Sequence, residues 1–128
     1  QVLLHVDGSR ARITINDPAH LNALSPAVMV QLVAAVDRVV RDPEVRTVVL
    51  TGSDPAFSAG GDLRMISGGS SSIRDQNQPA DTSDSWRWIR HQFGGVVRRI
   101  VRPEKCFIAA ANGPAAGVGL AFARRRRA

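Results

Sequence analysis

The stretch Phe57-Ser58-Ala59-Gly60-Gly61-Asp62-Leu63 places two adjacent glycines and an aspartate between a strand-like run and a short helical pattern. The preceding residues, Thr47 to Gly52, are mostly apolar and β-branched, which predicts a buried strand. Glycine lets a backbone approach a ligand closely, and the first N–H groups of a helix lack a partner within the helix. The stretch therefore predicts a site for an anion, or for an oxygen that becomes negatively charged during a reaction. From these residues alone, a plain glycine turn capped by Asp62 is the commoner alternative.

Length and composition fit one globular domain with a buried core. The chain has 128 residues, of which 44% are hydrophobic and 22% charged. No apolar run approaches the ~18 residues that span a membrane, and Gln1 to Asp7 lacks the features of a signal peptide. The single Cys106 excludes an internal disulfide and a cysteine-based metal cluster, and its apolar neighbours predict a buried side chain. These features predict a cytoplasmic protein with no membrane partner.

The net charge of +6 comes mainly from four arginines, Arg124 to Arg127, at the end of the chain. Without them the net charge is +2. No aromatic residues interleave with these arginines, and the sequence has no second basic cluster of that density. Nucleic-acid binding is therefore only a minor hypothesis, to be revived by salt-sensitive DNA binding that disappears when the arginines are deleted.

The first half of the chain predicts a hairpin followed by a helix. Asp7-Gly8 separates the apolar runs Val2–Val6 and Ala11–Asn16, which predicts a β-hairpin. Ser25-Pro26 predicts a helix start, and Asp42-Pro43 predicts its end. The segment between them has apolar residues at helical spacing, at Val28, Leu32, Val36, Val39 and Val40.

The second half repeats the order of strand, glycine loop and helix. Residues Ser67 to Ser85 are polar and predict a mobile loop, followed by a helical pattern from Trp86 to Ile100. Strands are predicted over Val45–Thr51 and Cys106–Ala111, and Asn112 to Leu120 forms a second loop rich in small residues. The helix after that loop should pack Val118, Leu120 and Phe122 onto the two strands. Two such loops, brought together, could supply two backbone N–H donors to one oxygen.

Three stretches, taken in order, resemble the crotonase superfamily, also called the enoyl-CoA hydratase/isomerase family. They are Asn22-Ala23-Leu24-Ser25, the run from Asp42 to Leu63, and the run from Ile108 to Leu120. Each motif alone is weak, whereas their order and spacing together are highly specific. The resemblance implies an α/β fold, a crotonase-like spiral of ββα units, of which residues 1–123 form the incomplete N-terminal part. It also implies a homo-oligomer, a trimer or a hexamer.

The resemblance further implies acyl-CoA thioester substrates, with coenzyme A arriving as part of the substrate and no separate cofactor. The shared chemistry is stabilisation of a thioester enolate by an oxyanion hole of two backbone N–H groups. Matched residue by residue, these donors are the N–H groups of Gly61 and Val118. The positions that match the coenzyme A side are Ala23, Leu24, Ala59, Asp62, Leu63 and Arg64.

Two features depart from the family pattern. Ala121 stands where the hydratases carry a catalytic glutamate, and the family's other main catalytic carboxylate comes from a segment beyond residue 128. In the family, the helix that begins near Val118 continues with apolar residues, whereas residues 124–128 here are four arginines and an alanine. Unpaired arginines are costly to bury, so these residues predict a truncated or altered end. A surface helix end that favours cations is the alternative.

Two classes of function follow from these observations. The first is an acyl-CoA enzyme, a lyase or an isomerase. Hydration of an enoyl-CoA normally uses two carboxylates, so Ala121 argues against a hydratase and is compatible with an isomerase that uses one acid/base residue. The second is a non-catalytic acyl-CoA-binding subunit or an inactive truncated fragment.

Overall fold

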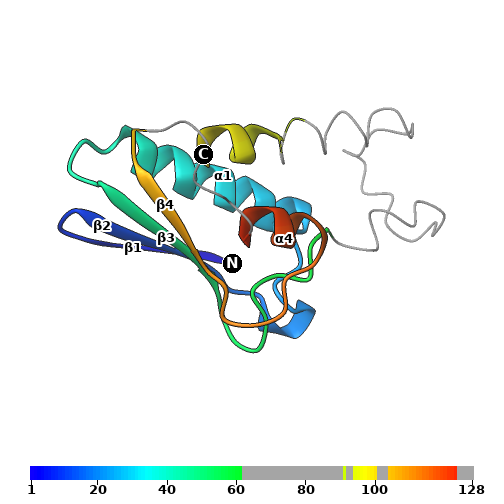
Figure 1. The fold of residues 1–128 in the computed structure, drawn as a ribbon. Helices are drawn as coiled ribbons and strands as arrows, with labels where there is room; N and C mark the ends of the chain where they lie inside the picture. Colours follow the sequence, from blue (N-terminus) through cyan, green and yellow to red (C-terminus); the bar gives the residue numbers. More distant parts are fainter. Residues whose placement is uncertain (62–90, 92–93, 101–103, 124–128) are drawn as a thin grey trace.

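The computed structural model describes residues 1–61, 91, 94–100 and 104–123. These residues form a four-stranded sheet, and helices lie across one of its faces (Figure 1). The predicted mobile loop at 67–85, residues 86–90 and 92–93 of the helical pattern, and the basic end at 124–128 lie outside the described residues, whereas residues 91 and 94–100 are helical as predicted. In the part that is described, no helix is both long enough and apolar enough to cross a membrane.

The sheet has the strand order β1-β2-β3-β4. β1 (Val2–Asp7) and β2 (Arg10–Ile15) form the predicted antiparallel hairpin, whose turn holds Gly8 at a φ of +57°. β3 (Thr47–Gly52) runs parallel to β2, and β4 (Cys106–Ala110) runs parallel to β3. The antiparallel pair β1–β2 therefore needs only a short turn, whereas the parallel pairs β2–β3 and β3–β4 need crossover connections.

Two details of the predicted strands are wrong. β3 begins two residues later than predicted, because the N–H of Val45 bonds to the carbonyl of Asp42 in the turn that follows the preceding helix. Cys106 is only half-buried, since it is the first residue of β4 at the edge of the described sheet.

Helix α1 (Pro26–Arg41) begins and ends where the sequence predicts. The Oγ of Ser25 accepts a hydrogen bond from the N–H of Val28 at 3.3 Å, which satisfies one of the free donors of the first turn. The buried face consists of Val28, Met29, Leu32, Ala35, Val36 and Val39. Val40, which belongs to the same apolar pattern, is 40% exposed. Each residue turns the helix by about 100°, which carries Val40 past the edge of the buried face.

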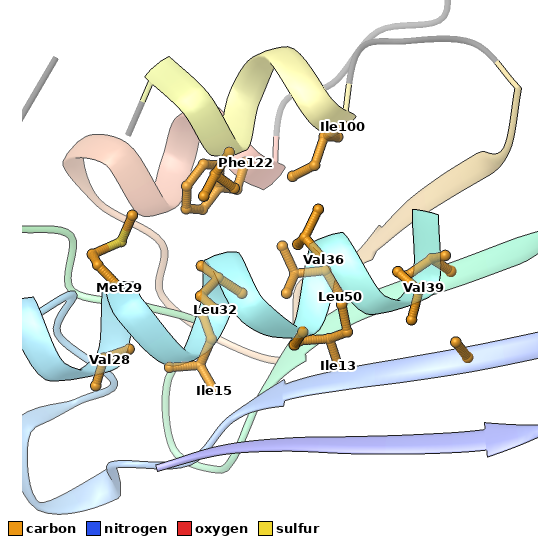
Figure 2. Close-up of a cluster of buried hydrophobic side chains, with 14 of the residues drawn as sticks. Ile13, Ile15, Val28, Met29, Leu32, Val36, Val39, Leu50, Ile100 and Phe122 are labelled. Carbon is orange, nitrogen blue, oxygen red and sulfur yellow. The ribbon is translucent and has the colours of Figure 1, made fainter. Parts of the chain in front are cut away.

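The core lies between the sheet and the helices. Leu32 and Val36 of α1 pack against Ile13 and Ile15, while residues 94–100 contribute Val96 and Ile100 (Figure 2). A short helix near the end of the described chain, α4 (Gly117–Ala123), adds the buried Phe122.

The predicted packing of α4 holds for Phe122 and is wrong for Leu120, which is 42% exposed. The two positions lie about 200° apart around a helix, so they cannot both face the core. The side chain of Val118 lies outside what the structure describes.

Two side-chain contacts tie the layers together. The Nε of Arg99 lies 2.5 Å from the Oδ1 of Asp37, which links residues 94–100 to α1. The Nζ of Lys105 donates to the carbonyl of Val45 at 2.7 Å and also to that of Asp42. The last carbonyls of a helix lack hydrogen-bond donors within the helix. Lys105, which directly precedes β4, supplies a donor to the carbonyl of Asp42 at the end of α1.

Candidate functional site

Two loops leave neighbouring parallel strands at the same edge of the sheet. Residues 53–61 follow β3, and residues 111–116 follow β4 and lead into α4. A short parallel bridge between Ser58 and Ala115 joins the loops. In this bridge the N–H groups of Phe57 and Ser58 donate to the carbonyl of Pro114 at 3.0 and 3.3 Å, and the N–H of Ala116 donates to the carbonyl of Ser58 at 3.0 Å. The structure therefore brings together the two glycine loops of the sequence.

The glycines of these loops adopt backbone conformations that other residues rarely adopt. Gly60 has a φ of +88° and Gly117 a φ of +53°. Gly119, in the first turn of α4, lies so close to Ser58 that a β-carbon there would be 2.7 Å from the Cβ of Ser58. Small residues at these positions permit the close approach of the two loops.

A third segment, residues 21–24, completes the junction. The N–H of Leu24 donates to the carbonyl of Gly60 at 2.7 Å, and the N–H of Ala59 donates to the carbonyl of Leu21 at 2.9 Å. Ala23 is half-buried and Ala59 is exposed beside this contact. Leu24 is completely buried and belongs to the core, so in this structure it presents no surface to a ligand. Asp62, Leu63 and Arg64 lie outside the described residues.

Asn22 is a buried polar residue that ties this third segment to the loop after β3. Its Nδ2 donates to the carbonyls of Ser53 and Ala56, both at 2.7 Å. Its Oδ1 accepts from the N–H of Asp17 at 2.8 Å and from the Oγ of Ser53 at 3.2 Å. The residue is completely buried and has a φ of +55°. Asparagine tolerates this left-handed backbone better than most residues, and its amide is fully used here.

Two more side chains hold the loops. The Oγ of Ser58 donates to the carbonyl of Asn22 at 2.8 Å and accepts from the N–H of Gly60 at 3.1 Å. On the other loop, the Oδ1 of Asn112 accepts from the N–H of Gly52 at 3.1 Å, and its Nδ2 donates to Asp54 at 3.2 Å. Sequence reasoning quoted Asn22, Ser58 and Asn112 only as parts of motifs. Their hydrogen bonds join segments far apart in the chain, so the sequence around each residue gives little signal of its role.

The two backbone donors of interest lie on either side of this junction. Gly61 is half-buried after the loop of β3, and Val118 is in the first turn of α4. The N–H of Gly61 donates no hydrogen bond to another residue that the structure describes. Val118 lies in the first turn of α4, where backbone N–H groups lack partners within the helix. In a planar trans peptide the carbonyl and the N–H point in opposite directions. Because the carbonyl of Gly60 accepts from Leu24, the N–H of Gly61 in the same peptide points away from Leu24.

Side chains with acid/base or metal-binding capacity are sparse around the junction. Ala121 is exposed on α4 and offers neither an acid nor a base. Among the described residues, no group of three or more His, Cys, Asp or Glu side chains could hold a metal ion. The Nδ1 of His20 lies 2.9 Å from the Oδ1 of Asp17, at the start of the segment that contains Asn22. What the described junction offers a ligand is therefore mainly backbone N–H groups.

Comparison with known proteins assigns the fold to a family. A family model described as enoyl-CoA hydratase/isomerase matches residues 6–124. A Mycobacterium tuberculosis protein named probable enoyl-CoA hydratase EchA14 is 38% identical over 122 residues, which cover 95% of this chain and 43% of that protein. The 1,2-epoxyphenylacetyl-CoA isomerase of Escherichia coli is 30% identical over 122 residues, which cover 95% of this chain and 44% of the isomerase.

A solved structure supports the same assignment. The enoyl-CoA hydratase/isomerase from Xanthobacter autotrophicus Py2 superimposes with a TM-score of 0.77 at 30% identity, over 94% of this chain and 42% of that one. The chain thus spans less than half the length of these proteins. Its α/β architecture corresponds to part of the crotonase-type fold. The chain belongs to the enoyl-CoA hydratase/isomerase family.

Proposed function

We propose that this chain supplies an oxyanion hole that binds acyl-CoA thioesters and stabilises their enolates. The observation that carries the proposal is the junction of the two glycine loops through Ser58 and Ala115, which brings the N–H of Gly61, without an acceptor among the described residues, near the first turn of α4 that contains Val118. Family membership supports it, as do the names of relatives that refer to enoyl-CoA and epoxyphenylacetyl-CoA.

In the proposed reaction, the thioester carbonyl oxygen accepts hydrogen bonds from Gly61 and Val118. When a base from solvent or from outside this chain takes a proton from the carbon next to the carbonyl, negative charge develops on that oxygen, and both hydrogen bonds then strengthen. Because the donors belong to a backbone held by other hydrogen bonds, they need little reorganisation as charge develops. The first turn of α4 adds the favourable end of a helix dipole. Removing one such donor typically lowers the rate by roughly 100-fold or more.

The coenzyme A portion would lie along Ala23 and Ala59, and would extend toward Asp62, Leu63 and Arg64. Coenzyme A enters as part of the substrate, so the proposal needs no separate cofactor. We also propose a trimeric or hexameric assembly and a cytoplasmic location.

The absence of a carboxylate at Ala121 favours a reaction that uses one acid/base group over a hydration that uses two. The same observation favours a second candidate function, a non-catalytic acyl-CoA-binding subunit. The two candidates differ in exchange of the proton next to the thioester carbonyl. An enzyme exchanges this proton with deuterated water, and a binding subunit leaves it in place.

Calorimetric titration of the 128-residue chain with acetoacetyl-CoA and crotonyl-CoA tests the proposal. We expect binding of both, with Gly61→Pro weakening acetoacetyl-CoA far more than coenzyme A. Proline deletes the N–H of Gly61, which is not used in the bridge to Leu24. No binding at millimolar ligand by a chain that unfolds cooperatively would overturn the proposal. Equal weakening of both ligands would show that Gly61 contributes structure and no oxyanion contact.

A further inference from the structure

Ser58 touches all three segments that meet at the candidate site. It is completely buried, at the centre of the bridge to Ala115. Its side chain bonds to Asn22 in the segment 21–24 and to Gly60 in its own loop. Gly119 of α4 packs against it, so closely that a β-carbon on Gly119 would lie 2.9 Å from the Oγ of Ser58.

The hydroxyl of Ser58 fixes one of the two peptide planes that flank Gly60. It accepts from the N–H of Gly60 at 3.1 Å, which holds the plane before Gly60. Leu24 holds the plane after Gly60 through the carbonyl, at 2.7 Å. That second plane carries the N–H of Gly61. Gly60 has a φ of +88° and no side chain to restrict it, so the angle between the planes depends on these two hydrogen bonds.

Ser58 also locates the beginning of α4. Its backbone N–H and carbonyl bond to Pro114 and Ala116, which directly precede Gly117. The first turn of α4 then rests on the side chain of Ser58 through Gly119. Since Val118 lies between Gly117 and Gly119, its N–H is held by contacts on both sides that involve Ser58.

We propose that Ser58 is a positioning residue that sets the directions of both backbone donors, Gly61 and Val118, toward one oxygen. The inference rests on the proposed oxyanion function and adds the residue that aligns it. Ser58 itself touches no substrate and reaches the oxyanion only through its neighbours. Misplacing a donor by about 1 Å can lower a rate by roughly 100-fold, so alignment matters as much as presence.

The test compares Ser58→Ala with Ser53→Ala in the 128-residue chain. The Oγ of Ser53 also donates to Asn22, at 3.2 Å, but among the described residues it makes no hydrogen bond to Gly60 or α4. Ser53→Ala is therefore a matched control that removes a hydroxyl contact to the same asparagine. A third variant, Ser58→Cys, nearly preserves side-chain size and replaces the hydroxyl with a weak donor and acceptor, in case alanine prevents folding.

Two ligands separate alignment from binding. Acetoacetyl-CoA reports the oxyanion contact, because its bound enolate absorbs ultraviolet light, and coenzyme A reports binding without a thioester. We expect Ser58→Ala to form enolate about 10- to 100-fold less readily at nearly unchanged affinity for coenzyme A. Ser58→Cys should fall in between, and Ser53→Ala should form enolate like the wild type. Amide exchange at Gly60 should accelerate in Ser58→Ala only.

The possible failures are distinct. A wild-type chain that forms no enolate overturns the proposed function, and the inference falls with it. A wild-type chain that forms enolate, with folded Ser58 variants that form as much, overturns the inference alone. Parallel losses of enolate and coenzyme A affinity in the Ser58 variants would also overturn it, because they would show a general structural role.

Discussion

Gly60 and Gly117 face each other across the junction of the two glycine loops, but they are not equivalent. A β-carbon on Gly60 would lie 2.6 Å from the carbonyl oxygen of Ala116 and 3.4 Å from the Cα of Gly117. A β-carbon on Gly117 would meet only the Cα of Gly60, at 3.8 Å. The space for a side chain is therefore missing on one side of the contact and present on the other.

This asymmetry predicts different costs for the same substitution. Gly117→Ala should lower the free energy of unfolding by about 1–2 kcal/mol, the cost of a side chain at positive φ. Gly60→Ala should cost about 3 kcal/mol or more, since a clash with backbone adds to the same conformational cost. Urea unfolding of the two variants measures the difference. Equal losses would mean that Ala116 moves aside freely.

Replacing the buried Asn22 with aspartate should change stability in a way that depends on pH. In Asn22→Asp, a buried carboxylate would face the carbonyl oxygens of Ser53 and Ala56 in place of an amide donor. We expect a loss of about 3 kcal/mol at neutral pH. Burial beside these oxygens raises the pKa of the introduced carboxyl, so the folded state binds more protons than the unfolded state. Stability should then fall as the pH rises from 5 to 8.

Asn112→Asp is the matched control for that experiment. Asn112 also donates to the carbonyl of Ala56, at 3.3 Å, but its side chain is exposed. The new carboxylate would face Asp54, to which Asn112 donates at 3.2 Å, but water and salt screen both charges on this exposed surface. We therefore expect a loss below about 1 kcal/mol in thermal melts across the same pH range. A loss as large as that of Asn22→Asp would show that burial does not explain the difference.

The hydrogen bonds of Lys105 at the end of α1 should contribute to the free energy of unfolding. Lys105→Met keeps the apolar stem and removes the ammonium that bonds to the carbonyls of Asp42 and Val45. We expect a loss of about 1.5–3 kcal/mol, the usual value for hydrogen bonds to a charged group. Arg98→Met is the comparison, because the hydrogen bond of the Arg98 Nε within the described part of the chain goes to the exposed carbonyl of Gly94. If chemical unfolding shows equal losses of stability in the two variants, the hydrogen bonds of Lys105 do not stabilise the end of α1.

Removing the N-cap side chain of α1 should cost less stability. Ser25→Ala removes the oxygen that accepts from the N–H of Val28, which typically costs about 1 kcal/mol. Ser25→Asp should restore most of the loss, because aspartate is an equally good cap. Equilibrium unfolding of the three proteins checks both expectations, and a fully stable Ser25→Ala variant would rule out the cap.

Elements with local signals could be predicted from sequence. Asp7-Gly8 marks a turn, and Ser25-Pro26 marks a helix start, by properties of adjacent residues alone. The packing of Leu120 is wrongly predicted, and Val40 lies outside the buried face, because apolar spacing indicates the direction of a buried face and not its width. The width depends on which strands lie beneath the helix, and that is a property of the assembled sheet.

The candidate site divides in the same way. Its glycine loops were visible as local motifs, and the family resemblance implied that the two loops meet. The roles of Asn22 and Ser58 were not visible, because their partners lie 31 to 36 residues away along the chain. A polar side chain in a motif does not reveal whether it faces solvent or carbonyl groups until the long-range pairing is known.

The same long-range pairing has a consequence for the order of folding. The hairpin and α1 form from neighbouring segments, whereas the bonds of Asn112 to Gly52 and of Thr51 to Ala110 close loops of 60 and 59 residues. Closing long loops is entropically costly and slow relative to local contacts. The two glycine loops should therefore come together after the β1–β2–α1 unit has formed. In pulse-labelled refolding, amides of β1, β2 and α1 should gain protection before those of Gly52 and Gly60.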